Sequence, residues 1–193
     1  MLTTETTRRA FLKATGALVV TFSLAPHALA QAGRKKPVAG DQVDSFLAIG
    51  RDGTVTVYTG KVDIGTGIRT AIPQMAAEEL DVALARVKLV EGDTALTPDQ
   101  GPTWGSLSIQ AAGVQIRQAA ATARKALVQM AVQRLGMPSA DLAVRDGVVM
   151  VRAEPQRRVS YVELIGDREF SLKLDPAAPL KDPRDYTVVG QPV

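Results

Sequence analysis

The sequence contains no cysteine, and its single histidine is His27. Without thiols the chain can form no disulfide, iron–sulfur site, zinc finger or cysteine nucleophile. Because His27 lies in a segment that we expect to be removed, the mature chain also lacks the base of a histidine-dependent triad. Any metal that the protein handles therefore arrives already chelated, or is held by oxygen ligands.

Aromatic residues and net charge are also scarce. Aromatics make up 4% of the 193 residues, so Ala, Val, Leu and Ile must build the core. Residues 1–30 hold three of the 23 basic groups and one of the 20 acidic groups, which leaves 20 basic and 19 acidic groups in the remainder. This balance provides no positive surface for nucleic acid. The length suits one domain with appendages.

Residues 1–30 have the features of an export signal. Arg8 and Arg9 stand one residue before Phe-Leu-Lys, a pattern that resembles the twin-arginine signal. The apolar stretch 14–25 is too short, and too often interrupted by polar residues, to span a bilayer. The sequence Ala-Leu-Ala at 28–30 matches the small-residue rule for cleavage. We therefore predict a periplasmic protein exported by the twin-arginine route, and not an integral membrane protein.

Two Asp-Gly pairs predict β-hairpins. Residues 52–53 lie between the apolar runs 46–50 and 54–58, and Asp146-Gly147 lies between a second pair of such runs, 142–144 and 148–151. Asp-Gly between alternating apolar runs is a strong hairpin signal. Further candidate strands are 87–91 and 170–174.

Three segments have helical patterns. The longest is 108–135, which ends at a glycine and has an alanine-rich inner face. A shorter helix reaches Leu80, with Thr70 as its N-cap candidate and Pro73 in its first turn. The Ser-x-x-Glu sequence at 160–163 is a capping box that opens a short helix. The order of elements predicts an α+β fold, with a mostly antiparallel sheet covered by one long and one shorter helix.

Two blocks of sequence are distinctive. The first is Gly-Lys-Val-Asp-Ile-Gly-Thr-Gly-Ile-Arg-Thr at 60–70, followed by Ala-Ala-Glu-Glu-Leu-Asp at 76–81. The second is Glu-Gly-Asp-Thr at 91–94, leading to Thr-Trp-Gly-Ser-Leu-Ser at 103–108. Together they resemble the xanthine dehydrogenase/aldehyde oxidase family of molybdenum hydroxylases. The similarity is greatest to its exported large subunits of the isoquinoline 1-oxidoreductase and nicotinate dehydrogenase type.

This resemblance covers the whole chain, but only the N-terminal portion of the family's large subunit. It implies the following division: a twin-arginine signal peptide at 1–30, a linker at 31–44, a partial molybdopterin-binding domain at 45–175, and an extended tail at 176–193 that leads to a further domain.

The resemblance also implies the cofactor, a molybdenum–molybdopterin cytosine dinucleotide. Gly65 and Gly67 lack side chains, so a ligand oxygen could approach their amides at the start of a helix. The 103–108 loop offers hydroxyls and amides just before the long helix, so the two loops could together grip a pyrophosphate. The predicted cofactor-binding residues are Gly65, Thr66, Gly67, Ile68, Arg69, Thr103, Gly105, Ser106, Leu107 and Ser108.

We predict no catalytic residue and no metal ligand in this chain. In the family, the pterin dithiolene supplies the sulfur ligands, and the general-base glutamate lies near the C-terminus of the full subunit. Many members have glutamine where this chain has Thr66, whose shorter side chain bears on contact with the metal centre but not on phosphate binding.

Several of these residues have simpler interpretations. The Gly-Thr-Gly sequence at 65–67 also occurs in ordinary turns. Ser106 and Ser108 are more often helix caps than ligands. Trp104, the sole tryptophan, is expected to pack against the protein, although it could also form a wall of the cofactor site.

Three charged residues near these blocks leave alternatives open. Glu78 and Glu79 are adjacent on a helix and point apart, so we expect them on a solvated face. Arg69 could pair a phosphate, or it could pair Asp63 or Asp93.

The resemblance implies that the complete subunit hydroxylates an aldehyde or an N-heterocycle with oxygen derived from water. This chain would be inactive alone and would supply part of the cofactor clamp. The implied partners are the remaining large-subunit domains, an iron–sulfur small subunit and, as a further candidate, a cytochrome c. The alternative is a non-catalytic binding or assembly module, or a gene fragment of that family. A periplasmic solute-binding protein is disfavoured, because the chain lacks two similar lobes.

Overall fold

The computed structural model describes residues 40–166 and 172–193. The predicted signal peptide lies outside the described residues, as does the first part of the candidate strand 170–174. Of that strand, Lys173 forms an isolated antiparallel bridge with Gln42.

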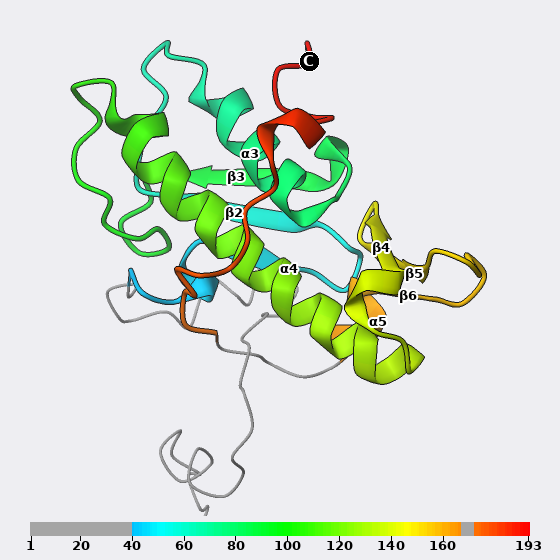
Figure 1. Ribbon diagram of the computed structural model, residues 1–193. Coiled ribbons are helices and arrows are strands. Elements are labelled where there is room, and N and C mark those ends of the chain that lie inside the picture. The colour runs from blue at the N-terminus through cyan, green and yellow to red at the C-terminus, as the bar shows by residue number, and fades with distance from the viewer. Residues whose placement is uncertain (1–39, 167–171) are drawn as a thin grey trace, which may run out of the picture.

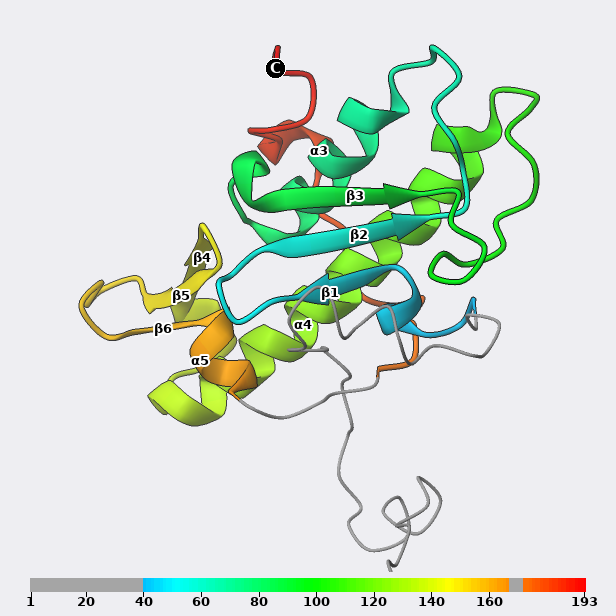
Figure 2. The same ribbon diagram turned by 180° about the vertical axis from the view of Figure 1, so that it is seen from behind.

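The strands of the described residues form two three-stranded sheets (Figures 1 and 2). In the first, β2 (Val55–Thr59) lies between β1 (Leu47–Ile49), which is antiparallel to it, and β3 (Val87–Glu91), which is parallel. In the second, every neighbouring pair is antiparallel, in the order β4 (Leu142–Arg145), β5 (Val148–Val151) and β6 (Arg158–Ser160). The α+β class and the mostly antiparallel pairing are therefore confirmed, with two sheets in place of the single one expected.

The main helices are α3 (Ile68–Leu80), α4 (Val114–Leu135) and the short α5 (Tyr161–Ile165). The predicted long helix at 108–135 is confirmed, but its first turn, η3 (Ser108–Gly113), is a π-helix. Four short 3-10 turns connect these elements: η1 (Val43–Ser45), η2 (Leu84–Arg86), η4 (Ser139–Asp141) and η5 (Pro183–Asp185).

The start of α3 differs from the prediction. The helix begins at Ile68 directly after Gly67, whose φ of 78° is left-handed, so Thr70 is not its N-cap. Pro73 consequently lies inside the helix and not in its first turn. Proline has no backbone N–H, so the helix lacks the hydrogen bond that residue 73 would donate to Arg69.

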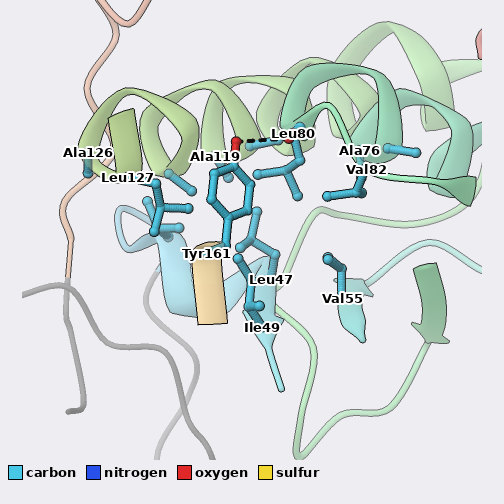
Figure 3. Close-up of a cluster of buried hydrophobic side chains, with 14 of the residues drawn as sticks. Leu47, Ile49, Val55, Ala76, Leu80, Val82, Ala119, Ala126, Leu127 and Tyr161 are labelled. Atoms are coloured by element: carbon cyan, nitrogen blue, oxygen red, sulfur yellow. Dashed lines mark hydrogen bonds between the residues drawn. The ribbon is translucent and has the colours of Figure 1, made fainter. Parts of the chain in front are cut away.

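The core lies between the helices and the first sheet (Figure 3). In Figure 1, α3 and α4 lie in front of β2 and β3, and Figure 2 shows the strands from the opposite side. Ala119 and Ala123 of α4 are fully buried, as is Ala76 of α3. Alanine side chains are small enough to let two helices approach closely, so the alanine-rich face packs within the chain, as predicted.

The second sheet is joined to the C-terminal end of α3. The Tyr161 hydroxyl donates a 3.0 Å hydrogen bond to the carbonyl oxygen of Leu80 (Figure 3). At the turn of the second hairpin, the amide of Gly147 donates to the Asp81 carbonyl oxygen, and Asp146 Oδ1 accepts from the Ala83 amide. The capping box at the start of α5 is confirmed, because the side chain of Ser160 and that of Glu163 each accept a hydrogen bond from the other's amide.

The C-terminal residues run across α4 and end beside α3 (Figure 1). Two carboxylates of α3 hold them, and both are buried, at 1% exposure for Glu78 and 0% for Glu79. The expectation of a solvated face was therefore wrong. The Lys181 amide of the tail donates to Glu79, and the Lys181 ammonium donates to Glu78. Glu79 is also paired with Arg117 of α4 at 2.6 Å. No helix within 40–166 or 172–193 has the length and apolar content that crossing a bilayer requires.

Candidate functional site: two loops at one sheet edge

Two loops leave the first sheet at the same edge. Because β2 and β3 are parallel and Thr59 is in register with Glu91, both strands end at this edge. The glycine loop (residues 60–67) follows β2, and the tryptophan loop (residues 92–107) follows β3. Both project at the same end of the molecule, on the left in Figure 1 and on the right in Figure 2. Loops at the carboxyl ends of parallel strands are a common location for ligand sites.

Side chains of the tryptophan loop accept hydrogen bonds from the end of β2 and the start of the glycine loop. Gln100 Oε1 accepts from the Thr59 hydroxyl at 2.7 Å and from the Gly60 amide at 3.0 Å. Thr103 Oγ1 accepts from the Val62 amide at 3.0 Å. A Cβ at Gly60 would lie 2.3 Å from the Pro98 carbonyl oxygen, so only glycine permits this close approach.

Lys61 adds a third connection between the loops. Its side chain is 2% exposed, and its ammonium donates to the carbonyl oxygens of Gly101 at 3.1 Å and Pro102 at 2.7 Å. The two loops are thus one connected unit.

The amides of the glycine loop converge on the carboxylate of Asp63. Asp63 Oδ1 accepts from the amides of Gly65 at 2.8 Å, Thr66 at 2.9 Å and Gly67 at 3.3 Å. Asp63 Oδ2 accepts from the Arg69 amide at 3.1 Å. The Arg69 hydrogen bond, together with those from the loop, holds the pKa of Asp63 below its usual value. The loop amides that were predicted to bind a ligand anion therefore bind the Asp63 carboxylate instead.

Arg69 pairs with Glu91, which was not among the partners considered for it. Its Nε donates to Glu91 Oε1 at 2.6 Å, and this contact raises the pKa of Arg69. Glu91 Oε2 also accepts from the Asp63 amide at 3.1 Å. The last residue of β3 thereby fixes both the start of the glycine loop and the first turn of α3.

The tip of the tryptophan loop is an exposed turn. Gly105 and Ser106 both have left-handed φ values, 56° and 58°, and the Leu107 amide closes the turn on the Trp104 carbonyl oxygen at 3.1 Å. No hydrogen bond to another described residue engages the amides of Gly105 and Ser106. Ser108 is 8% exposed and starts the π-helix, and no side chain caps that helix start.

Exposed apolar side chains gather on the same two loops. Trp104 and Ile64 are each 69% exposed, so the prediction that Trp104 packs against the protein was wrong. Most of the exposed large hydrophobic residues of the described chain lie on these loops or on the first turns that follow: Val62, Ile64, Trp104, Leu107, Ile109 and Val114.

The structure brings most of the predicted site residues to one end of the molecule. Thr66 is exposed on the glycine loop, and Thr103 links the two loops. Ile68 is 2% exposed and belongs to the hydrophobic core. Among the described residues, no three His, Cys, Asp or Glu side chains form a group that could hold a metal ion.

Sequence reasoning missed the three residues that build this unit, Lys61, Asp63 and Gln100. An aspartate two residues before Gly-x-Gly at the start of a helix is a signal that could have identified Asp63, because short acidic side chains cap exposed amides. Nothing local identifies Lys61 or Gln100, whose partners lie about 40 residues away along the chain.

Comparison with known proteins identifies the family of the chain. A family model described as "Molybdopterin cofactor-binding domain" matches residues 6–186. A nicotinate dehydrogenase subunit from Pseudomonas putida is 38% identical over 95% of this chain and 15% of its own length. The beta subunit of isoquinoline 1-oxidoreductase from Brevundimonas diminuta is 30% identical over 84% of this chain and 22% of its own length.

Solved structures show the same fold. CO dehydrogenase from Oligotropha carboxidovorans matches 67% of this chain and 18% of its own, with a TM-score of 0.57 and 22% identity. Quinoline 2-oxidoreductase from Pseudomonas putida 86 matches 68% of this chain and 18% of its own, with a TM-score of 0.52 and 26% identity. The chain therefore matches less than a fifth of each of these structures.

Proposed function

Because the chain belongs to the molybdopterin cofactor-binding domain family of the molybdenum hydroxylases, we propose that it forms one part of the cofactor site in such an oxidoreductase, with a molybdopterin cytosine dinucleotide as the ligand. The observation that carries this proposal is the joining of the glycine and tryptophan loops at one sheet edge. When bound, the cofactor supplies the redox chemistry of its molybdenum centre.

The two loops fit the cofactor in different ways. The tryptophan loop offers the exposed amides of Gly105 and Ser106, which can donate to phosphate oxygens. The amides of the glycine loop are taken by Asp63, so this loop presents side chains, chiefly Thr66. We assign phosphate binding to the tryptophan loop and a packing or polar contact to Thr66.

The activity of the whole protein is an extension of this proposal, because the chain spans only 15% and 22% of the two relatives described above. The names of these relatives refer to two N-heterocyclic compounds, nicotinate and isoquinoline. We propose hydroxylation of an N-heterocycle or an aldehyde with water-derived oxygen. The proposed partners are the remaining large-subunit domains, an iron–sulfur small subunit and, as a further candidate, a cytochrome c.

Export through the twin-arginine route is a separate proposal that rests on residues 1–30. A fusion of residues 1–40 to a fluorescent protein is expected to reach the periplasm. Changing Arg8 and Arg9 together to lysine keeps the charge and is expected to retain the fusion in the cytoplasm. Equal export of both fusions would refute the twin-arginine assignment.

A chimera tests the cofactor proposal. This chain replaces the aligned region of the Pseudomonas putida nicotinate dehydrogenase subunit, and the purified complex is analysed for molybdenum and for nucleotide released on hydrolysis. We expect bound molybdenum and cytidine monophosphate. Gly105→Ala is expected to lower the molybdenum content, whereas Gly136→Ala, which places alanine at a similar φ of 64° at the far end of α4, is not. A well-folded chimera without molybdenum would contradict the proposal.

A further inference from the structure

Lys61 occupies a position where the sheet pattern calls for an apolar residue. Burial alternates along β2, with Val55, Val57 and Thr59 facing the core, and the alternation continues past the end of the strand to Lys61 at 2% exposure. A buried ammonium loses its hydration, and that loss is compensated only by well-placed partners. An aliphatic side chain would fill the same space without this cost, so the charge itself needs an explanation.

The partners of Lys61 are main-chain carbonyls and not a carboxylate. Its ammonium binds the oxygens of Gly101 and Pro102, and no acidic group of the described residues lies within salt-bridge distance. Lys181, the other lysine of residues 40–166 and 172–193 with a largely buried side chain, is paired with the carboxylates of Glu78 and Asp81. Lys61 therefore binds the main chain of a loop, whereas Lys181 forms ion pairs with carboxylates.

The loop that Lys61 contacts has no regular secondary structure, so side-chain contacts such as those of Gln100, Thr103 and Lys61 fix its position. Residues 92–106 contain no helix or strand. Unstructured connections of this length in compact domains are commonly functional. Pro102 lies only two to four residues before the exposed turn of Trp104, Gly105 and Ser106, so an anchor there sets the position of the turn relative to the glycine loop.

We infer that Lys61 is a positioning residue of the cofactor site, which fixes the tryptophan loop against the glycine loop so that the amides of Gly105 and Ser106 are held ready for an anionic ligand. The role in cofactor binding rests on the proposed function, but the role in fixing the loop does not.

The sole tryptophan of the chain makes the loop directly observable. Trp104 lies two residues beyond the carbonyl that Lys61 binds, so its fluorescence anisotropy and its quenching by acrylamide report the order of the turn. Lys61→Met replaces the side chain with an unbranched apolar one that is a single atom shorter, and removes the ammonium. Lys181→Met is the matched control, because it removes a largely buried ammonium that does not contact this loop.

We expect Lys61→Met to lower the anisotropy of Trp104 and to increase its quenching, with the far-ultraviolet circular dichroism of the chain unchanged. Lys181→Met should leave both Trp104 signals as in the wild type, although it weakens the tail. In the chimera with the nicotinate dehydrogenase subunit, Lys61→Met should lower the molybdenum content relative to the chimera without this change, because the amides of Gly105 and Ser106 are no longer held in place.

The outcomes separate the two claims. Unchanged Trp104 signals in Lys61→Met would overturn the inference, whatever the chimera shows. Lower Trp104 anisotropy with unchanged molybdenum content would show that Lys61 orders the loop but does not contribute to cofactor binding, which would overturn its role in the cofactor site. A wild-type chimera that binds no molybdenum would instead refute the proposed function. Lys61→Gln is the second variant, and if both variants are unfolded, Lys61 is a core residue and the inference is wrong.

Discussion

The Oδ2 atom of Asp63 lies 3.1 Å from the backbone nitrogen of Arg69, so a residue of the glycine loop caps the first turn of α3. The other oxygen of the carboxylate accepts three more amide hydrogen bonds from residues 65–67. A carboxylate at a helix N-terminus satisfies free amides and interacts favourably with the helix dipole. One side chain thereby determines both the shape of the loop and the start of the helix.

Asp63→Ala is therefore expected to lower the free energy of unfolding by more than Asp52→Ala does. Asp52 is a suitable control, because it is also an aspartate with local hydrogen bonds, to Thr54, but it caps no helix. Urea denaturation followed by circular dichroism measures both changes. Equal effects of the two substitutions would show that the four amides do not depend on Asp63.

Glu78→Gln is expected to release the C-terminal tail. One oxygen of this buried carboxylate accepts from the amides of Thr187, Val188 and Val189, and the other binds the Lys181 ammonium at 2.9 Å. An amide side chain cannot offer two anionic acceptors, so breaking this arrangement should cost about 3 kcal/mol in the free energy of unfolding. Limited proteolysis should then cut residues 182–193 faster than in the wild type.

The control for Glu78→Gln is Glu154→Gln, whose side chain is 57% exposed and pairs only with Arg157. Surface pairs of this kind contribute about 0.5 kcal/mol. A Glu78→Gln chain that resists proteolysis as well as the Glu154→Gln chain does would show that the tail is held by other contacts.

The same carboxylate predicts a pH dependence. Burial raises the pKa of Glu78, but the hydrogen bonds from Val189, Val188, Lys181 and Thr187 outweigh it, so the pKa lies below its usual value of 4.5. A depressed carboxylate pKa gives stability that is fully present above 4.5 and is lost as the pH falls through the folded-state pKa. The difference in unfolding free energy between wild type and Glu78→Gln should thus shrink as the pH falls below 4.5. A constant difference between pH 6 and pH 3 would contradict this.

Features that depend on a few neighbouring residues were predictable from the sequence. The turn at Asp146 and Gly147 has two left-handed φ values, 48° and 71°, which this pair adopts readily. The capping box at 160–163 and the glycine that ends α4 are equally local signals. The division of the strands into two sheets, by contrast, depends on pairing between distant segments and was not predicted.

Features that depend on distant partners were not predictable. Glu78 and Glu79 have the spacing of a solvated pair, and only partners distant along the chain make them internal. These are the tail, about 100 residues later, for both carboxylates and Arg117 of α4 for Glu79. For the candidate site, the family motifs located both loops, but not the contacts made by Lys61 and Gln100 that join them. The exposure of Trp104 also contradicts the usual preference of a large aromatic side chain for the interior.

Tyr161→Phe tests the junction between α3 and the second sheet. Tyr161 is 2% exposed, and burial raises the pKa of its hydroxyl, which therefore stays protonated and donates to the Leu80 carbonyl oxygen. Removing the hydroxyl leaves that carbonyl without this partner, at an expected cost of about 1–2 kcal/mol in urea denaturation. Tyr186→Phe is the control, since its ring keeps the cation–π contact with Arg117. Equal stability of the Tyr161→Phe chain and the wild type would show that the hydroxyl contributes nothing at the junction.

Gly60→Ala tests whether the two loops depend on close backbone approach. The added Cβ would lie 2.3 Å from the Pro98 carbonyl oxygen and 3.2 Å from the Gln100 nitrogen, so the tryptophan loop must move away. We expect a loss of about 1–3 kcal/mol in unfolding free energy, typical of overpacking, and a fall in Trp104 anisotropy. Gly40→Ala, where nothing lies within 4 Å, should change neither. If Gly60→Ala lowers the stability but leaves the Trp104 anisotropy unchanged, the turn is held independently of residue 60. The contact between the loops then does not position the turn.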